Sequence, residues 1–215
     1  MPPKQLNDEE RRETRKRILD AARTLFAEHG VEATTMREIA RQVGCSATAI
    51  YLYFKDKRDL FRSLCATDFL ALAEEMREAE KIADPLERLH ALGLGYARFA
   101  LSHPNHYRLM FMTRWPQVEK SDLGIEQGNP EQDAYAQLRV VVVAAHTAGC
   151  FRPDLDDPEL IAQTLWAGVH GVCALEITMA DDCWTDWRPF EARLGLMTDA
   201  LLRSLVRTPP DVRDG

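Results

Sequence analysis

The stretch Thr34–Lys55 reads TTMREIARQVGCSATAIYLYFK, and it decides the fold of the N-terminal part of the chain. Counted from Met36, the fifth residue is Ala40, whose small side chain lets two helices cross closely. The ninth is Gly44, which can adopt the positive φ of a tight turn, and the fifteenth is Ile50, which can fix a second helix on the first. This spacing predicts a helix-turn-helix, whose second helix enters the major groove of DNA. An ordinary hairpin of two helices remains the alternative at this point.

The second helix of this motif would turn polar and small side chains outward. Hydroxyl groups can bind phosphates or base edges, and small side chains allow close approach to a thymine methyl group. Lys55 would begin the next helix, where a lysine and free backbone N–H groups can hold one phosphate. The outward-facing residues are Ser46, Ala47, Thr48, Ala49, Tyr51 and Tyr53.

The charge of the chain is uneven. Residues 1–62 hold 13 Lys and Arg against 10 Asp and Glu, whereas the remainder holds 14 against 24. A DNA-binding protein needs positive charge only where it meets phosphate, so the overall net charge of −7 does not exclude DNA binding. A basic run, Arg11 to Arg17, precedes the motif and is interleaved with Glu9, Glu10 and Glu13. This run is either a DNA contact or a solvated helix face in which the glutamates pair with the arginines.

Almost every other segment repeats its apolar residues at helical spacing. Caps such as Asp84-Pro85 and Asp157-Pro158 mark helix starts. The segment 115–130 carries prolines and glycines and predicts a loop that is mobile or lines a site. No strand is expected, and no apolar run approaches the length of a membrane span. The expected helices outside the motif are about 9–28, a helix beginning near Asp56, and helices near 85–103, 104–114, 131–149, 157–180 and 187–206.

The sequence shows no pattern of an enzyme or a metal protein. Its five cysteines are widely spaced and form no CxxC pair, which argues against a zinc site and a disulfide framework. His103 and His106 are three residues apart, but no third ligand lies near them in the sequence. No nucleophile accompanies a general base. We therefore expect no catalytic residue, no metal and no cofactor.

The N-terminal part resembles the tetracycline-repressor (TetR) family over about residues 12–65. The matching residues are Phe26, Gly30, Thr34-Thr35, Ile39-Ala40, Gly44, Ser46, Ile50-Tyr51, Tyr53-Phe54-Lys55 and Leu60-Phe61. The resemblance implies an all-α fold with a three-helix DNA-binding head, residues 9–65, and a larger helical body, residues 66–207. In this family the body forms the dimer and binds a small molecule that releases the DNA.

The resemblance also assigns the DNA contacts. Phosphate contacts fall on Thr35, Ser46, Tyr51, Tyr53 and Lys55, and Thr34 joins them as part of the matching pair. The base-facing residues are Ala47, Thr48 and Ala49. Many members have a lysine and a glycine at the positions of Ala47 and Thr48, and a histidine at that of Tyr53, so the operator sequence stays open.

The second half resembles a TetR subgroup named for a Trp-His-Gly signature. The matching residues are His103-Pro104, Tyr107 through Phe111, Gly149 through Pro153, Trp166 and His170-Gly171. Aromatic and methionine side chains can line an adaptable apolar pocket, and they make an ordinary core equally well. The candidate effector contacts are Tyr107, Met110, Phe111, Trp115, Trp166 and His170.

These observations predict a cytoplasmic, nucleoid-associated regulator that represses transcription. A homodimer would bind a pseudo-palindromic DNA operator and would be released by a small-molecule effector. The last two helices of each subunit would form a four-helix dimer bundle. A regulator whose body docks a protein partner, and an enzyme or carrier that uses a helical hairpin, remain the alternatives.

Overall fold

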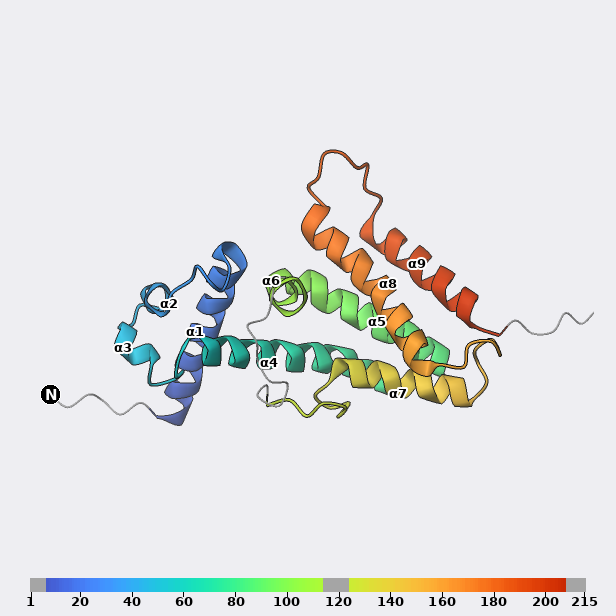
Figure 1. Ribbon diagram of the computed structural model, residues 1–215, viewed down its shortest axis with the longest axis horizontal. Helices are drawn as coiled ribbons and strands as arrows, with labels where there is room; N and C mark the ends of the chain where they lie inside the picture. The colour runs from blue at the N-terminus through green and yellow to red at the C-terminus, as the bar shows by residue number, and fades with distance from the viewer. Residues whose placement is uncertain (1–6, 114–123, 208–215) are drawn as a thin grey trace, which may run out of the picture. The chain divides into compact units, whose positions relative to one another are not determined.

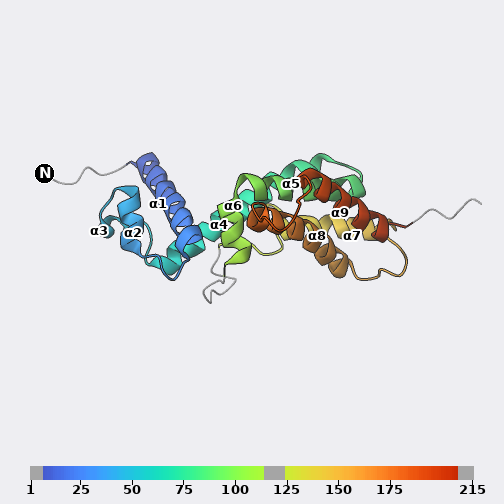
Figure 2. The same ribbon diagram turned by 90° about the horizontal axis from the view of Figure 1, so that it is seen from above.

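The computed structural model describes residues 7–113 and 124–207. Within these ranges the chain is helical, and its one β-contact is an isolated bridge between Phe151 and Val206 (Figures 1 and 2). The chain falls into two compact units, as far as each is described. Residues 7–69 with 103–113 and 124–125 form the first unit, and residues 70–102 with 126–207 form the second. The predicted all-α fold is confirmed.

The first unit begins with the predicted helix-turn-helix. Helix α1 spans Asp8–His29, α2 spans Met36–Val43 and α3 spans Ala47–Ile50. Helix α4, Lys57–Met76, starts in this unit and ends in the second. The turn between α2 and α3 contains Gly44 in the left-handed conformation, with φ 78° and ψ 32°, as the motif requires.

Local capping chemistry sets where these helices begin. Asn7 caps α1 and Thr35 caps α2, each in a capping box with the residue three positions on. Ser46 caps α3. That helix was expected to run to about Tyr53, but it ends at Ile50, because the N–H of Tyr53 turns back to the Ile50 carbonyl at 2.9 Å in a tight turn.

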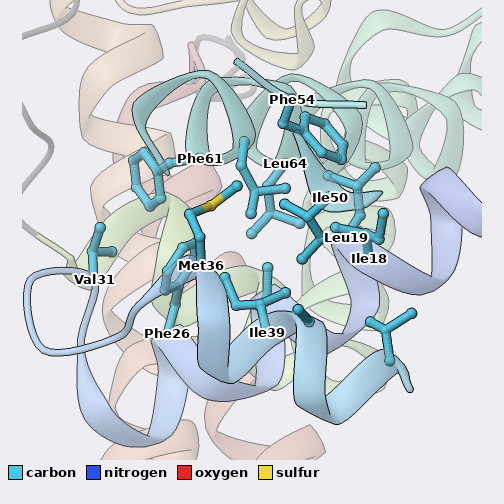
Figure 3. Close-up of a cluster of buried hydrophobic side chains, with 14 of the residues drawn as sticks. Ile18, Leu19, Phe26, Val31, Met36, Ile39, Ile50, Phe54, Phe61 and Leu64 are labelled. Carbon is cyan, nitrogen blue, oxygen red and sulfur yellow. The ribbon is translucent and has the colours of Figure 1, made fainter. Parts of the chain in front are cut away.

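The helices of the head close around one apolar core (Figure 3). Ile18 from α1, Ile39 from α2, Ile50 from α3 and Phe61 from α4 are all fully buried in it. Phe26 and Phe61 meet edge to face, with ring centroids 5.8 Å apart. Because each of the four helices supplies a buried side chain, α3 is fixed to the rest of the head.

A short segment completes the first unit. The expected helix at 104–114 is instead α6, Pro104–Tyr107, followed by a π-helical turn, η2, Arg108–Met112. Both α6 and η2 pack against α1. Among them lies Asp68 of α4, which is fully buried and forms an ion pair with Arg23 of α1 at 2.7 Å. His106 Nδ1 of α6 lies 3.2 Å from the same oxygen of Asp68.

The second unit is a bundle. It consists of the end of α4, a 3-10 turn η1 (Arg77–Lys81), and helices α5 (Pro85–Ser102), α7 (Ala134–Thr147), α8 (Pro158–Met179) and α9 (Phe190–Leu205). Helix α5 packs on α7 and α8, and α9 lies along α8 (Figure 1). Asp133 caps α7, which therefore starts three residues later than predicted. Pro189 precedes α9, which starts at Phe190 instead of the predicted 187.

Helix α8 carries much apolar surface that this unit does not cover. Among the described helices it alone is long and apolar enough to cross a membrane by length and composition, and only 22% of its most apolar stretch is buried. One side of α8 packs tightly within the chain. A Cβ atom at Gly168 would lie 2.5 Å from Leu201 Cδ1 of α9, so any other residue there requires side chains of α9 to shift.

Candidate DNA interface

Helix α3 presents its first turn to solvent from a fixed base. Ile50 is fully buried, and Ser46 Oγ accepts the N–H of Ala49 at 3.1 Å, which holds the start of the helix. Ser46 and Thr48 are exposed, while Ala47 and Ala49 are half-buried. The turn therefore offers two hydroxyl groups and two methyl groups on a short, rigid surface. This set of groups suits both phosphate and base-edge contacts.

The segment after α3 supplies larger side chains. Tyr51 is 54% exposed, and Lys55 is exposed. Tyr53 is half-buried and packs against the apolar core of the head. The backbone N–H of Lys55, expected to be free for a phosphate, instead donates to Asp59 Oδ2 at 2.9 Å. The ammonium group of Lys55 is thus the part of that residue that can meet a phosphate.

The two threonines before α2 differ. Thr35 is exposed, and its hydroxyl takes part in the capping box with Glu38. That box, through hydrogen bonds from the Thr35 N–H and hydroxyl, lowers the pKa of Glu38. Thr34 is only 1% exposed, and its hydroxyl donates to the carbonyls of Leu25 and Gly30. The Thr34 side chain, predicted to contact DNA, is therefore buried in this structure.

Two cations outside the predicted set of site residues donate hydrogen bonds to backbone carbonyls of the motif and of the turn before it. Lys57 Nζ donates to the carbonyls of Val31, Glu32 and Thr34, at 2.6, 3.0 and 3.0 Å. Arg17 Nη2 donates to the carbonyl of Val43 at 2.7 Å and so caps the end of α2. No local sequence signal identifies these contacts, because each joins residues more than 20 positions apart.

Further cations are exposed around the motif. Three exposed side chains make no hydrogen bond or ion pair within the described residues: Arg37 of α2, Arg58 of α4 and Lys55. Together with Ser46 and Thr48 they supply positive charge and hydroxyl groups on the head. Such a combination suits the phosphate backbone of nucleic acid.

Comparison with known proteins identifies the family. Residues 18–64 match the family described as bacterial regulatory proteins, tetR family, and residues 89–182 match a tetracyclin repressor-like C-terminal domain. The chain is 30% identical to the HTH-type transcriptional repressor KstR2 of Mycolicibacterium smegmatis over 166 residues, which covers 73% of this chain and 78% of that protein. This chain is a member of the TetR family. It is therefore a DNA-binding transcriptional regulator, and its relatives are regulators, not enzymes.

Other matches agree with the TetR assignment. The HTH-type transcriptional regulator AcrR of Shigella flexneri is 48% identical over 56 residues, which span only 26% of each protein. The crystal structure of a TetR family regulator from Marinobacter aquaeolei VT8 has a TM-score of 0.74 at 18% identity, covering 94% of this chain and 100% of that one. The finer resemblance to the Trp-His-Gly subgroup stays a prediction.

In this TetR-family chain, two of the candidate effector contacts share a hydrogen-bond network in the second unit. Trp166 Nε1 donates to Tyr96 Oη at 3.3 Å, and Tyr96 Oη lies 2.9 Å from His170 Nδ1. Burial lowers the pKa of His170, which favours its neutral form. A neutral ring can accept the Tyr96 proton at Nδ1 in one tautomer, or donate from Nδ1 to the Tyr96 oxygen in the other. Tyr96 was not among the predicted contacts.

Three other candidate effector contacts lie in the first unit. Tyr107 is fully buried, and Met110 is nearly so. Phe111 is half-buried and packs against Tyr107 and Phe69, with ring centroids 5.0 and 5.8 Å away. These contacts make them part of the packing of the first unit. Trp115 lies outside the described residues.

Proposed function

We propose that this TetR-family chain is a ligand-responsive repressor that binds a pseudo-palindromic operator as a homodimer. The observation that carries the proposal is the first turn of α3. It is exposed and rich in hydroxyl groups, and the buried Ile50 fixes it to the core. Ser46, Tyr51, Tyr53 and Lys55 would contact phosphates, and residues 47–49 would face the bases. Thr35 would add a phosphate contact from the start of α2.

The second unit offers a surface for the dimer. Along α8, residues at helical spacing leave Leu160, Ala167, Gly171 and Leu175 on the side away from the bundle, and a Cβ at Gly171 would meet nothing within 4 Å. On α9, Leu196 is 74% exposed. Small residues with flanking leucines allow two helices to approach closely, so α8 and α9 of two copies would form a four-helix bundle. This use also accounts for the uncovered apolar surface of α8.

Replacement of Gly171 tests the dimer surface. A Cβ atom at this position would meet nothing within 4 Å, so Gly171→Leu should retain the fold, but it would separate two α8 helices that meet there. Native mass spectrometry should show a dimer for the wild type and an increased monomer fraction for Gly171→Leu. A variant that remains fully dimeric would exclude this face.

The effector would bind beside the Tyr96–His170–Trp166 network. These are polar groups in a mainly apolar bundle, and such groups fix the orientation of a small ligand. The effector would release DNA by favouring a conformer that binds the operator poorly, which requires different affinities for the two conformers. Native mass spectra of the purified protein test this idea. A retained small molecule that is absent from His170→Phe supports it; a protein partner retained in its place would favour docking instead.

The remaining parts of the proposal follow from these sites. Residues 9–65 would act as the DNA-binding domain and residues 66–207 as the effector-binding and dimerisation domain. The protein would work in the cytoplasm, associated with the nucleoid. KstR2, which covers most of this chain, is named a transcriptional repressor, and this supports repression here.

Selection of bound duplexes from a random DNA pool tests the proposed function as a whole. The purified protein, at physiological salt, should enrich an inverted repeat. Failure to enrich any sequence would contradict it.

A further inference from the structure

The N-terminal half of α1 carries four exposed cations: Arg11, Arg12, Arg15 and Lys16. Within the described residues none of their side chains forms an ion pair or a hydrogen bond. The sequence alone leaves open whether the glutamates of the same segment pair with them. The structure shows no such pair among the described residues, and Glu10 accepts the backbone N–H of Asn7 at 2.9 Å in the capping box.

Helical geometry gathers the cations of α1 on the side that carries its buried residues. Successive residues of a helix are about 100° apart, so residues three, four and seven positions apart share a face. Arg11 and Arg15 continue the row of Ile18 and Ala22, both of which are buried in the head core. Arg12 and Lys16 continue the neighbouring row, which leads to the buried Leu19. The cations therefore lie on the side of α1 that faces the rest of the head.

The glutamates lie beside the cations, toward the exposed side of the helix. Glu9 and Glu13 continue the row that leads through Lys16 to the exposed Asp20, so Lys16 lies at the border between the two signs of charge. Asp8, at the start of α1, is the acidic residue on the side of Arg11 and Arg15. The basic residues thus form one face, Arg11, Arg12, Arg15 and Lys16, called the α1 basic face below.

The α1 basic face adjoins the segment that follows α3. The guanidinium of Arg15 lies over the Phe54 ring, 4.9 Å from its centroid. Phe54 is buried, and its chain neighbours are Tyr53 and Lys55, two of the proposed phosphate contacts. The stacking of Arg15 on Phe54 therefore places the α1 basic face next to the segment that carries Tyr53 and Lys55.

We propose that the α1 basic face is a second DNA-contacting surface, which binds backbone phosphates beyond those reached by α3 and its following turn. Arg11, Arg12 and Lys16 would each be free to meet a phosphate, while Arg15 stays stacked on Phe54 and adds charge. These contacts strengthen binding to every sequence alike, because phosphates carry no sequence information. The inference rests on the proposed function, since it assumes DNA as the partner.

The salt dependence of binding tests this surface. The full-length wild type, Arg11→Gln/Arg12→Gln and Lys16→Gln are titrated with a duplex enriched from a random pool, and with an unrelated duplex, from 50 to about 300 mM salt. Removal of one cation–phosphate interaction makes the slope of log K against log salt less steep by about 0.9. In a dimer, Lys16→Gln should thus change the slope by about 1.8 and Arg11→Gln/Arg12→Gln by about twice as much, each with an equal loss of affinity for both duplexes.

Matched controls separate a local contact from a change in net charge. Lys81→Gln/Arg188→Gln removes two exposed cations from the second unit, and Glu13→Gln removes a carboxylate from the side of α1 away from Arg11 and Arg15. Both should keep the wild-type slope, and circular dichroism should show every variant folded. An unchanged slope in both α1 variants, or an equal change in Lys81→Gln/Arg188→Gln, overturns the inference. A wild type that binds no duplex would instead contradict the proposed function.

Discussion

Removal of the Asp68 carboxylate should destabilise the first unit strongly. Asp68 is 0% exposed and Arg23 is 7% exposed. Two hydrogen bonds join them, from Arg23 Nη2 to Asp68 Oδ1 at 2.7 Å and from Arg23 Nε to Oδ2 at 3.3 Å. Burial alone would lower the pKa of Arg23, but the hydrogen bonds and charges of Asp68, and then of Asp20, outweigh it and raise the pKa. The guanidinium therefore stays charged in the core.

The magnitude follows from what Asp68→Ala leaves behind. Arg23 keeps a hydrogen bond to Asp20 at 2.7 Å, but the side chain of Asp20 is 54% exposed. The rest of the guanidinium remains buried without an anion. Loss of one partner from a buried ion pair costs about 3–5 kcal/mol. Because whole domains are stable by about 5–15 kcal/mol, such a loss should shift unfolding well below the wild-type midpoint.

The assay is urea unfolding followed by circular dichroism, with the double variant Arg23→Met/Asp68→Leu as the matched control. Replacing both partners by apolar residues leaves no buried charge, so the double variant should retain most of the wild-type stability. A single Asp68→Ala variant as stable as the wild type would refute this reasoning. So would a double variant that is as unstable as the single one.

Four further predictions concern individual sites. Ser46→Ala removes the cap of α3 and should lower the free energy of unfolding by about 1 kcal/mol, measured by urea titration; no change would show that the cap is dispensable. Lys55→Ala should weaken binding to all duplexes alike and reduce the salt slope by about 1 for each phosphate that is no longer bound, and an unchanged slope would exclude this interaction. Gly168→Leu should destabilise the second unit by about 1–3 kcal/mol, because even a Cβ atom there would lie 2.7 Å from Met197 Sδ. Wild-type stability of this variant would show that α9 can move aside. Because the pKa of His170 is lowered in the folded chain, the unfolded chain takes up a proton first as the pH falls below about 6.5. The free energy of unfolding of the wild type should therefore fall there relative to that of His170→Gln. Parallel profiles of unfolding free energy against pH would contradict the shift.

Local chemistry explains which parts of the fold the sequence predicts. The capping box of Thr35 with Glu38, the positive φ of Gly44 and the buried Ile50 all depend on neighbouring residues, and all are present as predicted. The same holds for Asp157-Pro158 at the start of α8. The family resemblance rests on these positions, and the match to KstR2 confirms it.

Contacts between distant segments explain what the sequence does not predict. The ion pair of Arg23 with Asp68 joins residues 45 positions apart, and no periodicity indicates which arginine a buried carboxylate meets. The same applies to Lys57, which binds three carbonyls of the turn before α2. Thr34 matches the family pattern, yet its hydroxyl binds backbone carbonyls, because a motif does not distinguish a buried threonine from an exposed one.

The most direct test of the central claim, that two copies read one inverted repeat, is the stoichiometry of the protein–DNA complex. The full-length protein is mixed with the enriched duplex, and with a duplex in which one half-site is scrambled, and each complex is weighed by native mass spectrometry. We expect two chains on the intact repeat and much weaker binding to the half-site duplex. A single chain on the intact repeat, or equal affinity for both duplexes, would contradict it.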